Sequence, residues 1–174
     1  MLLQRLDFLL PFEVKLLTVA DIDEIYALQT KHHPHHKLYL GRRVTKEDVL
    51  EDLTSLPPKA VPDQKFYLGF YQAKQLVAVV DLILDYPSST CAWLGVIMIK
   101  KELVRQGIAT KIMHALKGAL KREGYQELFT LIPVDQLVAQ TFFDTLDFNN
   151  GVLTSVYNPA LKHEQSAKLR SLVL

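Results

Sequence analysis

The segment WLGVIMI at residues 93–99, followed by KKELV at 100–104 and RQGIAT at 105–110, decides the fold of this chain. It predicts an apolar strand, a short loop and the start of a helix. Such a junction directs unpaired backbone N–H groups and the positive end of the helix dipole towards one point, where an anionic phosphate fits. Gly107 lets the backbone approach a ligand closely because it has no Cβ.

This loop differs from two common phosphate-binding motifs. The chain contains no G-x-x-x-x-G-K-[ST] run, and no G-x-G-x-x-G follows a strand. P-loop NTPases and Rossmann enzymes are therefore not the classes that the segment predicts. A lone glycine before a helix is also compatible with an ordinary turn, so the neighbouring sequence has to decide.

The sequence of the loop resembles the GNAT superfamily of N-acetyltransferases. The family's phosphate loop follows the pattern Q/R-x-x-G-x-G/A, and residues 104–109 read VRQGIA, so that Gly107 and Ala109 match. Val104 replaces the leading Gln or Arg, which removes one side-chain contact but no backbone donor. Arg105 offers a positive charge one position later.

A second segment, residues 139–148, is similar to the family pattern A-x-x-F-Y-x-x-x-G-F, with Phe143 and Asp147 as departures. The resemblance extends from about Val14 to Tyr157. It implies acetyl-CoA as the cofactor and a primary amine of a small molecule or peptide as the acceptor. The implied pantetheine contacts are the backbone groups of Ile97, Met98 and Ile99. The implied pyrophosphate contacts are Val104, Arg105, Gln106, Gly107, Ile108, Ala109 and Thr110, and further cofactor contacts are Gln136 and Phe143.

The composition is that of an ordinary globular protein. The 174 residues correspond to about one domain, with 49% hydrophobic and 22% charged residues. A net charge of +1 offers no broad surface for nucleic acid. The single cysteine, Cys91, excludes an internal disulfide and is compatible with a reducing compartment, so we expect a cytoplasmic protein.

Residues 1–12 form an apolar arm that precedes a single domain at residues 13–174. Arg5 and Asp7 interrupt the arm, which is too short to span a bilayer and lacks the features of a signal peptide. We expect it to pack on the domain as a short helix or extended segment and not to contact a membrane. The alternative is a contact with a partner, such as a homodimer.

Hydrophobic patterning predicts one mixed-sheet α/β domain. We expect strands at residues 13–18, 66–71, 76–84, 90–99, 128–132 and 151–157. Two helices begin at the capping pairs Thr18/Asp21 and Thr45/Asp48. Two more are expected at residues 108–123 and 137–146, and residues 167–174 form either a last strand or a helix. The order βααβββαβαβ, with a possible further C-terminal strand, is the one that a GNAT fold implies.

The base that would deprotonate an amine is predicted on a strand. Many family members have an acidic residue on the strand before the loop, where this chain has Gly95 and Val96. Asp81 lies on the preceding strand in an apolar run, and an apolar environment raises the pKa of a carboxyl group, as a base requires. Asp81 is therefore the candidate catalytic residue, with Asp85 as a second choice and a plain solvated position as the alternative. The family commonly has a proton-donating tyrosine where this chain has Phe143.

Four histidines, His32, His33, His35 and His36, surround Pro34 and are expected to interrupt the first helix as a polar connection. Adjacent residues around a proline seldom converge on one ion, so no metal site is expected. The resemblance places this connection at the acceptor side of the cleft, where one histidine would act as a base through water. A simple polar loop is the alternative.

Two other functional classes compete with an acetyltransferase. The first is an acyl-CoA-binding sensor or interaction module with little catalysis, which the lack of an acidic residue on the central strand and the presence of Phe143 favour. The second is a small α/β protein without a cofactor.

Overall fold

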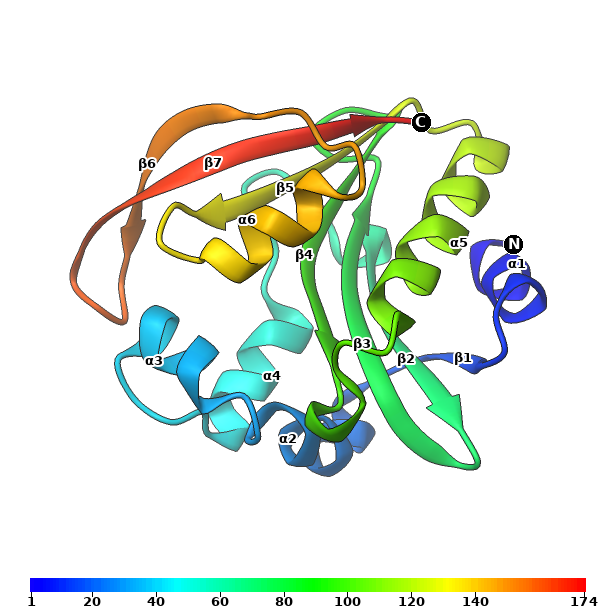
Figure 1. Cartoon of the computed structure of the whole chain (residues 1–174), viewed down its shortest axis with the longest axis horizontal. Helices are drawn as coiled ribbons and strands as arrows, with labels where there is room; N and C mark the ends of the chain where they lie inside the picture. Colours follow the sequence, from blue (N-terminus) through cyan, green and yellow to red (C-terminus); the bar gives the residue numbers. More distant parts are fainter.

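A seven-stranded sheet in the order β1-β2-β3-β4-β5-β7-β6 forms the centre of this computed structural model, which describes residues 1–174 (Figure 1). The strands are β1 (Glu13–Leu16), β2 (Lys65–Gln72), β3 (Gln75–Leu84), β4 (Cys91–Ile99), β5 (Glu127–Pro133), β6 (Val152–Asn158) and β7 (His163–Val173). Only β4 and β5 are parallel neighbours. The predicted single mixed-sheet α/β fold is confirmed, including the further C-terminal strand.

Six helices cover the sheet: α1 (Leu2–Leu9), α2 (Ile22–Gln29), α3 (His33–Leu40), α4 (Lys46–Thr54), α5 (Ile108–Glu123) and α6 (Leu137–Asp144). A large apolar core joins α1, α5 and α6 to one face, and a smaller core joins α2 and α4 to the other (Figure 1). The N-terminal arm forms α1, whose Leu2 and Leu6 belong to the large core. None of the helices combines the length and apolar character needed to cross a lipid bilayer.

Both predicted capping pairs form at helix starts. The Thr45 hydroxyl accepts the N–H of Asp48, and the Asp48 carboxylate accepts the N–H of Thr45, as a capping box requires. Thr18 and Asp21 make a similar box around a short 3-10 turn that leads into α2. Helix α5 ends at Gly124 in a left-handed conformation, as the sequence predicts.

The histidine-rich segment differs from its prediction. It is not a polar loop but helix α3, which begins at His33 and ends before Gly41. Pro34 lies in the first turn, where a backbone N–H has no intrahelical acceptor, so proline starts this helix without a lost hydrogen bond. The predicted end of the preceding helix is confirmed, because α2 stops at Gln29.

The sheet opens between β4 and β5. Their pairing runs only from Cys91–Glu127 to Leu94–Thr130, and the Thr130 hydroxyl donates to the carbonyl oxygen of Leu94 at 3.0 Å at the last pair. Beyond this point β4 continues along β3, whereas β5 continues along β7. Figure 1 shows the two strands diverging. Divergence leaves the β5-facing edge of residues 95–99 without a neighbouring strand.

A β-bulge lies where the strands separate. Asp81 of β3 pairs with Val96 of β4, and Leu82 pairs with Leu94, which leaves Gly95 as the extra residue. A Cβ at Gly95 would lie 2.6 Å from Oδ2 of Asp81. The carboxylate of Asp81 therefore occupies the space that a β4 side chain would take, and any other residue at position 95 would displace it.

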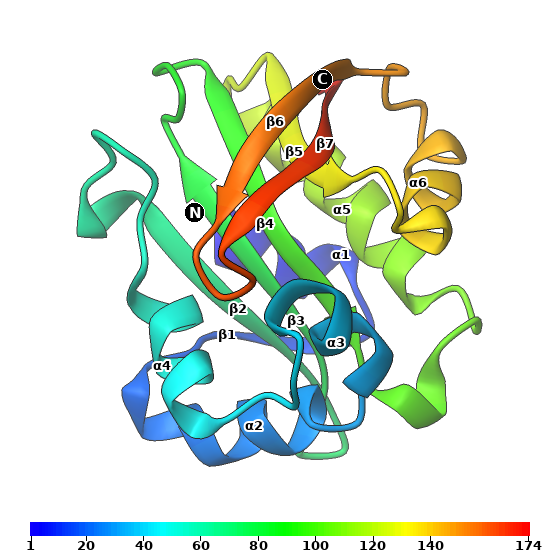
Figure 2. The same ribbon diagram turned by 90° about the vertical axis from the view of Figure 1, so that its left-hand side faces the viewer.

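The hairpin of β6 and β7 reaches across to α3. The side chain of Asn158 donates to the carbonyl oxygen of Tyr39 at 2.9 Å, and Gln165 donates to that of Leu38 at 3.4 Å. Figure 2 shows the tip of the hairpin near α3. The hairpin and α3 therefore bound the opening of the sheet from opposite sides.

Candidate active site

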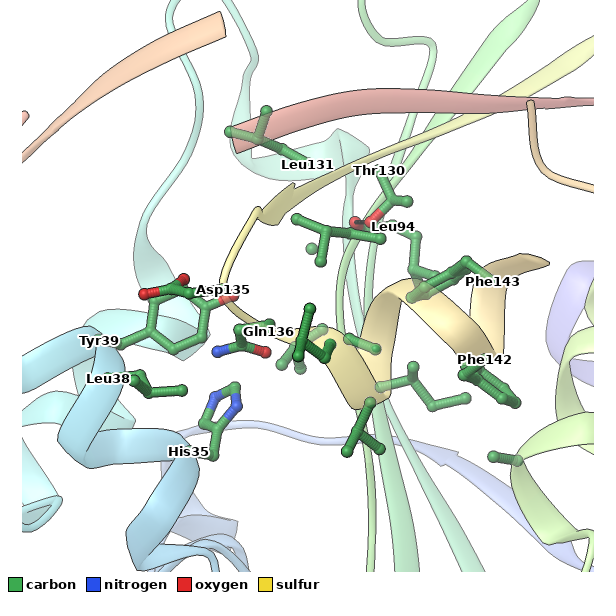
Figure 3. Close-up of a pocket in the computed structure, with 18 of the residues that line it drawn as sticks. His35, Leu38, Tyr39, Leu94, Thr130, Leu131, Asp135, Gln136, Phe142 and Phe143 are labelled. Carbon is green, nitrogen blue, oxygen red and sulfur yellow. Dashed lines mark hydrogen bonds between the residues drawn. The ribbon is translucent and has the colours of Figure 1, made fainter. Parts of the chain in front are cut away.

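A cavity of about 530 Å³ lies in the opening between β4 and β5. Its walls come from α3, β4, β5 and α6. Figure 3 shows His35, Leu38 and Tyr39 of α3 on the left, Phe142 and Phe143 of α6 on the right, and Gln136 between the two groups. Most of its lining is apolar, so the cavity accommodates an elongated ligand with few polar groups.

A second cavity, of about 750 Å³, lies on the other side of the bulge, below the β6–β7 hairpin and beside α4. The two cavities share six lining residues: His35, Tyr39, Leu94, Gly95, Val96 and Leu131. They therefore meet at the bulge on β4. If each cavity held a ligand, one end of each ligand would lie at the bulge.

The loop before α5 has the geometry that an anion requires. Gly107 caps the helix with φ +81°, a conformation that favours glycine, and its Cα faces open space. The backbone N–H groups from Gly107 to Thr110 donate no hydrogen bond within the chain. These donors and the helix dipole suit a phosphate group.

The sequence-predicted cofactor residues divide into three groups. Four line the first cavity: Ile97, Ala109, Gln136 and Phe143. Six form the loop and first helical turn beside its Ala109 end: Val104, Arg105, Gln106, Gly107, Ile108 and Thr110. The remaining two lie outside both cavities. Met98 packs in the core beneath α2 and α4, and the carbonyl of Ile99 accepts the Nε2–H of His32 at 2.7 Å.

Two of the cavity residues have clear side-chain environments. The Nε2 atom of Gln136 is buried without a hydrogen-bond partner, so it is free to donate to a ligand. Phe143 is buried and packs edge-to-face against Phe142 and Phe148, with ring centroids 5.2 and 4.9 Å apart. Phe143 therefore anchors α6 to the core and offers no proton to the cavity.

Asp81 lies at the junction of the two cavities, because its carboxylate lies against Gly95, which lines both of them. It lines the second cavity, and the ammonium group of Lys65 donates to its Oδ2 at 3.2 Å. Its Oδ1 is buried and accepts no hydrogen bond. Burial raises the pKa of Asp81, and the charge of Lys65 opposes part of this rise. Oδ1 of Asp81 is thus a buried acceptor that no donor of the protein satisfies.

A second carboxylate, Asp52 of α4, faces the same cavity. The fully buried amide of Gln29 donates both to Oδ2 of Asp52 at 3.2 Å and to the hydroxyl of Tyr67 at 3.1 Å. Tyr67 pairs with Asp81 across β2 and β3, so the polar groups form one row. Asp52 is exposed at the wall of the open cavity, but desolvation by the surrounding protein raises its pKa to about 6, and the nearby charge of Asp81 adds to the rise.

The histidines of α3 do not act as one group. His35 lines both cavities, and burial lowers its pKa to about 4, which keeps the imidazole neutral near pH 7. His32 is bound to Ile99, and Nδ1 of His36 donates to the carbonyl oxygen of His32 at 3.0 Å. A group with so low a pKa is a weaker proton acceptor than Asp52, whose pKa is about 6.

Asp85, the second choice for a base, lies outside both cavities. It directly follows the C-terminal end of β3, where it accepts a hydrogen bond from the Tyr125 hydroxyl at 3.1 Å. Sequence reasoning missed Asp52, Tyr39 and Trp93, which all line the second cavity. Asp52 lies four residues after Asp48, a spacing that places both side chains on the same face of α4. No other local sequence pattern indicated a role for Asp52.

Comparisons with known proteins agree with this geometry. Residues 22–148 match the sequence model of the acetyltransferase (GNAT) family. No curated protein matches the chain by sequence. Among solved structures, an acetyltransferase from Thermus thermophilus superimposes with a TM-score of 0.72 at 18% identity, covering 95% of this chain and 99% of that chain.

Two further solved structures share the fold. A ribosomal-protein-S18-alanine N-acetyltransferase from Escherichia coli has a TM-score of 0.67 at 14% identity, with 93% of each chain covered. The PaiA N-acetyltransferase from Thermoplasma acidophilum, in complex with coenzyme A, has a TM-score of 0.61 at 14% identity, covering 95% of this chain and all of that chain. The family match spans most of the chain and includes the opened strand, the loop and α5. This chain therefore belongs to the GNAT family of acetyltransferases.

Proposed function

We propose that the protein transfers the acetyl group of acetyl-CoA to a primary amine of a small molecule or peptide, by direct attack of the amine on the thioester. The observation that carries this proposal is the meeting of two cavities at the bulge on β4. One cavity leads towards the α5 loop and the other towards α4 and the hairpin. Two substrates entering from opposite sides would react where the cavities join.

The cofactor fits the first cavity and the adjoining loop. In this proposal, the N–H groups from Gly107 to Thr110 bind the pyrophosphate, and the apolar walls near Ile97 surround the pantetheine arm. The buried donor of Gln136 would meet a pantetheine carbonyl oxygen. Acetyl-CoA supplies the activated thioester. The similar structure from Thermoplasma acidophilum contains coenzyme A, which supports this choice of ligand.

Asp81 serves as the base in this proposal. An alkyl amine with a pKa near 10.4 is less than about 0.1% neutral at pH 7, so it must lose a proton before it attacks. The unpartnered Oδ1 of Asp81 accepts that proton at the junction of the cavities. A positioned base of this kind contributes about 10²- to 10⁴-fold to the rate.

The departing sulfur receives no proton from Phe143. A thiol has a pKa of about 8.5, so its thiolate leaves without an acid more easily than an alkoxide would. Because Phe143 is part of the core, its replacement would alter packing before it altered chemistry. The lack of a donor there also favours a second candidate function, an acyl-CoA-binding module with little catalysis.

Titration calorimetry with acetyl-CoA, followed by thiol release against a panel of primary amines, tests the proposal. We expect saturable binding of acetyl-CoA and thiol release that depends on an amine. Binding without release on any amine would support the binding module instead. Absence of binding to acetyl-CoA and to coenzyme A would contradict both functions.

A further inference from the structure

The second cavity has an acidic lining that the acetyl transfer itself does not require. Four carboxylates line it, and Arg42 is the only Lys or Arg side chain among its lining residues. Arg42 is not available to balance them all, because both of its terminal nitrogens bind the carboxylate of Asp48 at 2.7 and 2.9 Å. This ion pair holds the pKa of Asp48 at about 2, so Arg42 and Asp48 neutralise each other.

Three carboxylates then remain, and they differ in their partners. Asp81 has one oxygen bound to Lys65, and its buried Oδ1 accepts nothing. Glu51 and Asp52, on adjacent positions of α4, form no ion pair with any Lys, Arg or His of the chain. The cavity thus holds more negative charge than the protein compensates. A buried acceptor without a donor is costly unless a ligand supplies the donor.

The acidic groups lie at two places along the cavity. Asp81 touches the bulge at Gly95, where the cavities meet, whereas Asp52 and Glu51 belong to α4. Side chains with apolar surface, including Tyr67, line the same cavity. A ligand that matches this arrangement has an amine at the junction, an aliphatic chain, and a second cation beside α4. An ammonium group offers three donors and no acceptor, which is the complement of carboxylate oxygens.

We propose that the acceptor is an aliphatic diamine whose reacting amine lies at Asp81 and whose second ammonium group lies between Asp52 and Glu51. This inference rests on the acetyltransferase function proposed above and narrows its acceptor class. The reaction is an ordinary amide formation from a thioester and an amine. The C–N bond forms as the C–S bond breaks. The reacting ammonium gives one proton to Asp81 before it attacks, its nitrogen gives a second proton to the departing thiolate, and the other ammonium keeps its charge throughout.

A comparison of acceptors tests this proposal. The kcat/KM for thiol release is measured for a homologous series of α,ω-diaminoalkanes and for n-alkylamines of the same carbon numbers. We expect the best diamine to exceed its matched monoamine by about tenfold or more, because a hydrogen bond to a charged group contributes that much. The ratio of kcat/KM for diamine and monoamine should be highest at one chain length, because the fold fixes the distance between Asp81 and the carboxylates of α4.

Asp52→Asn keeps the shape of the side chain and an acceptor for Gln29 but removes the charge. We expect it to lower the diamine-to-monoamine ratio of kcat/KM about tenfold, mainly through KM. Glu47→Gln is the matched control, because it makes the same charge change on α4 at a residue outside the cavity, and it should leave the ratio unchanged. Circular dichroism of each variant shows whether the fold is retained.

The outcomes separate this inference from the function on which it rests. Turnover of monoamines and diamines at equal kcat/KM, or an equal loss of ratio in Asp52→Asn and Glu47→Gln, would overturn the diamine proposal and leave the acetyltransferase intact. Absence of thiol release with every amine of both series would overturn the diamine proposal, and absence of release with peptide amines as well would overturn the acetyltransferase function. A diamine preference that persists in Asp52→Asn would place the second cation elsewhere and would equally overturn the assignment.

Discussion

At the residue scale, one carboxylate and one glycine define the proposed reaction centre. Strand β4 before the loop contains no acidic residue, whereas Asp81 stands on β3, and Gly95 leaves the space that its carboxylate fills. The charge thus reaches the junction of the cavities from the neighbouring strand. The lack of an acidic side chain on β4 therefore does not remove a base from the site.

Replacement of Asp81 tests its role as the base. Asp81→Asn should lower kcat by about 10²- to 10⁴-fold and affect the affinity for acetyl-CoA little, because the base contacts the amine and not the cofactor. In the unchanged protein, activity should fall on acidification through the raised pKa of Asp81, since only its deprotonated form accepts a proton. The pH profile of kcat in the variant should lack this acidic limb.

Asp85→Asn is the matched control, because it removes a carboxylate at the end of the same strand but outside both cavities. It should keep the rate and the pH profile of the unchanged protein. Equal losses in the two variants would show that the effect of Asp81→Asn is structural.

The charge of Asp52 should cost stability at neutral pH. Its pKa is about 6 in the folded protein and about 3.9 in an unfolded chain, so the folded state disfavours the charged form. The cost is present above about pH 6 and disappears below about pH 4. Asp52→Asn should therefore raise Tm by about 2–4 °C at pH 8, corresponding to about 1 kcal/mol after allowance for screening by solvent in the open cavity.

Scanning calorimetry at several pH values measures this difference. The gain in Tm should shrink towards zero as the pH falls to about 4. Glu47→Gln, at an exposed position of the same helix, should show no such pH-dependent gain. A gain that stays constant with pH would mean that Asp52 is not the titrating group.

At the element scale, the position of α6 depends on a single arginine of β7. Arg170 is 1% exposed, and its guanidinium binds Asp144 and the carbonyl oxygens of Gln140, Phe148 and Asn149. It also donates to the side-chain oxygen of Gln140 at 3.1 Å. These contacts attach the helix that carries Phe143, and that follows Gln136, to the sheet. The wall of the first cavity is therefore set from a strand that lies two places away from β4.

Arg170→Met should destabilise the protein by about 3 kcal/mol, because it leaves several buried carbonyl groups and Asp144 without a donor. For a chain of this length the corresponding fall in Tm is about 6–12 °C. Thermal unfolding followed by circular dichroism measures this. Lys168→Met, on the same strand with one long contact to Asn150 at 3.4 Å, is the control and should change Tm little. Equal Tm values for the two variants would contradict the role of Arg170.

At the scale of the whole molecule, the sheet consists of two parts joined by a short parallel pairing. Strands β1 to β4 form one part and β5, β7 and β6 form the other, and the hydrogen bond from Thr130 to Leu94 marks the end of their contact. A ligand in the first cavity would contact both parts and the first turn of α5. Its binding should therefore stabilise the molecule as a whole.

Acetyl-CoA at about 100 times its Kd should raise Tm by about 5–10 °C, corresponding to about 2.7 kcal/mol. Amide hydrogen exchange should slow at the start of α5 and along β4 beyond Leu94 more than on β1, because the proposed contacts lie there. ATP, which has phosphates but no pantetheine arm, should give a smaller rise. Equal protection across the entire sheet would contradict this placement.

Much of the fold could be predicted from local patterns. Alternating apolar residues predicted β2, and nearly continuous apolar runs predicted β3 and β4. The capping boxes predicted the starts of helical segments, and Gly107 predicted the loop before α5. Two segments were ambiguous or wrong. The tail pairs as β7 because β5 and β6 present edges on both sides of it, and the Pro34 segment folds as α3 because proline is tolerated in a first turn.

The sequence by itself determined the family, the order of most elements and the loop that suits a phosphate, because these depend on residues close together in the chain. Only the tertiary structure decided which carboxylates share a cavity. Asp52 and Asp81 come from a helix and a strand that no local pattern connects, and Gln29, Tyr67 and Lys65 join them through the fold. Charge, burial and hydrogen bonding at such a site depend on these long-range contacts, which is why the acidic lining of the second cavity could not be predicted from spacing.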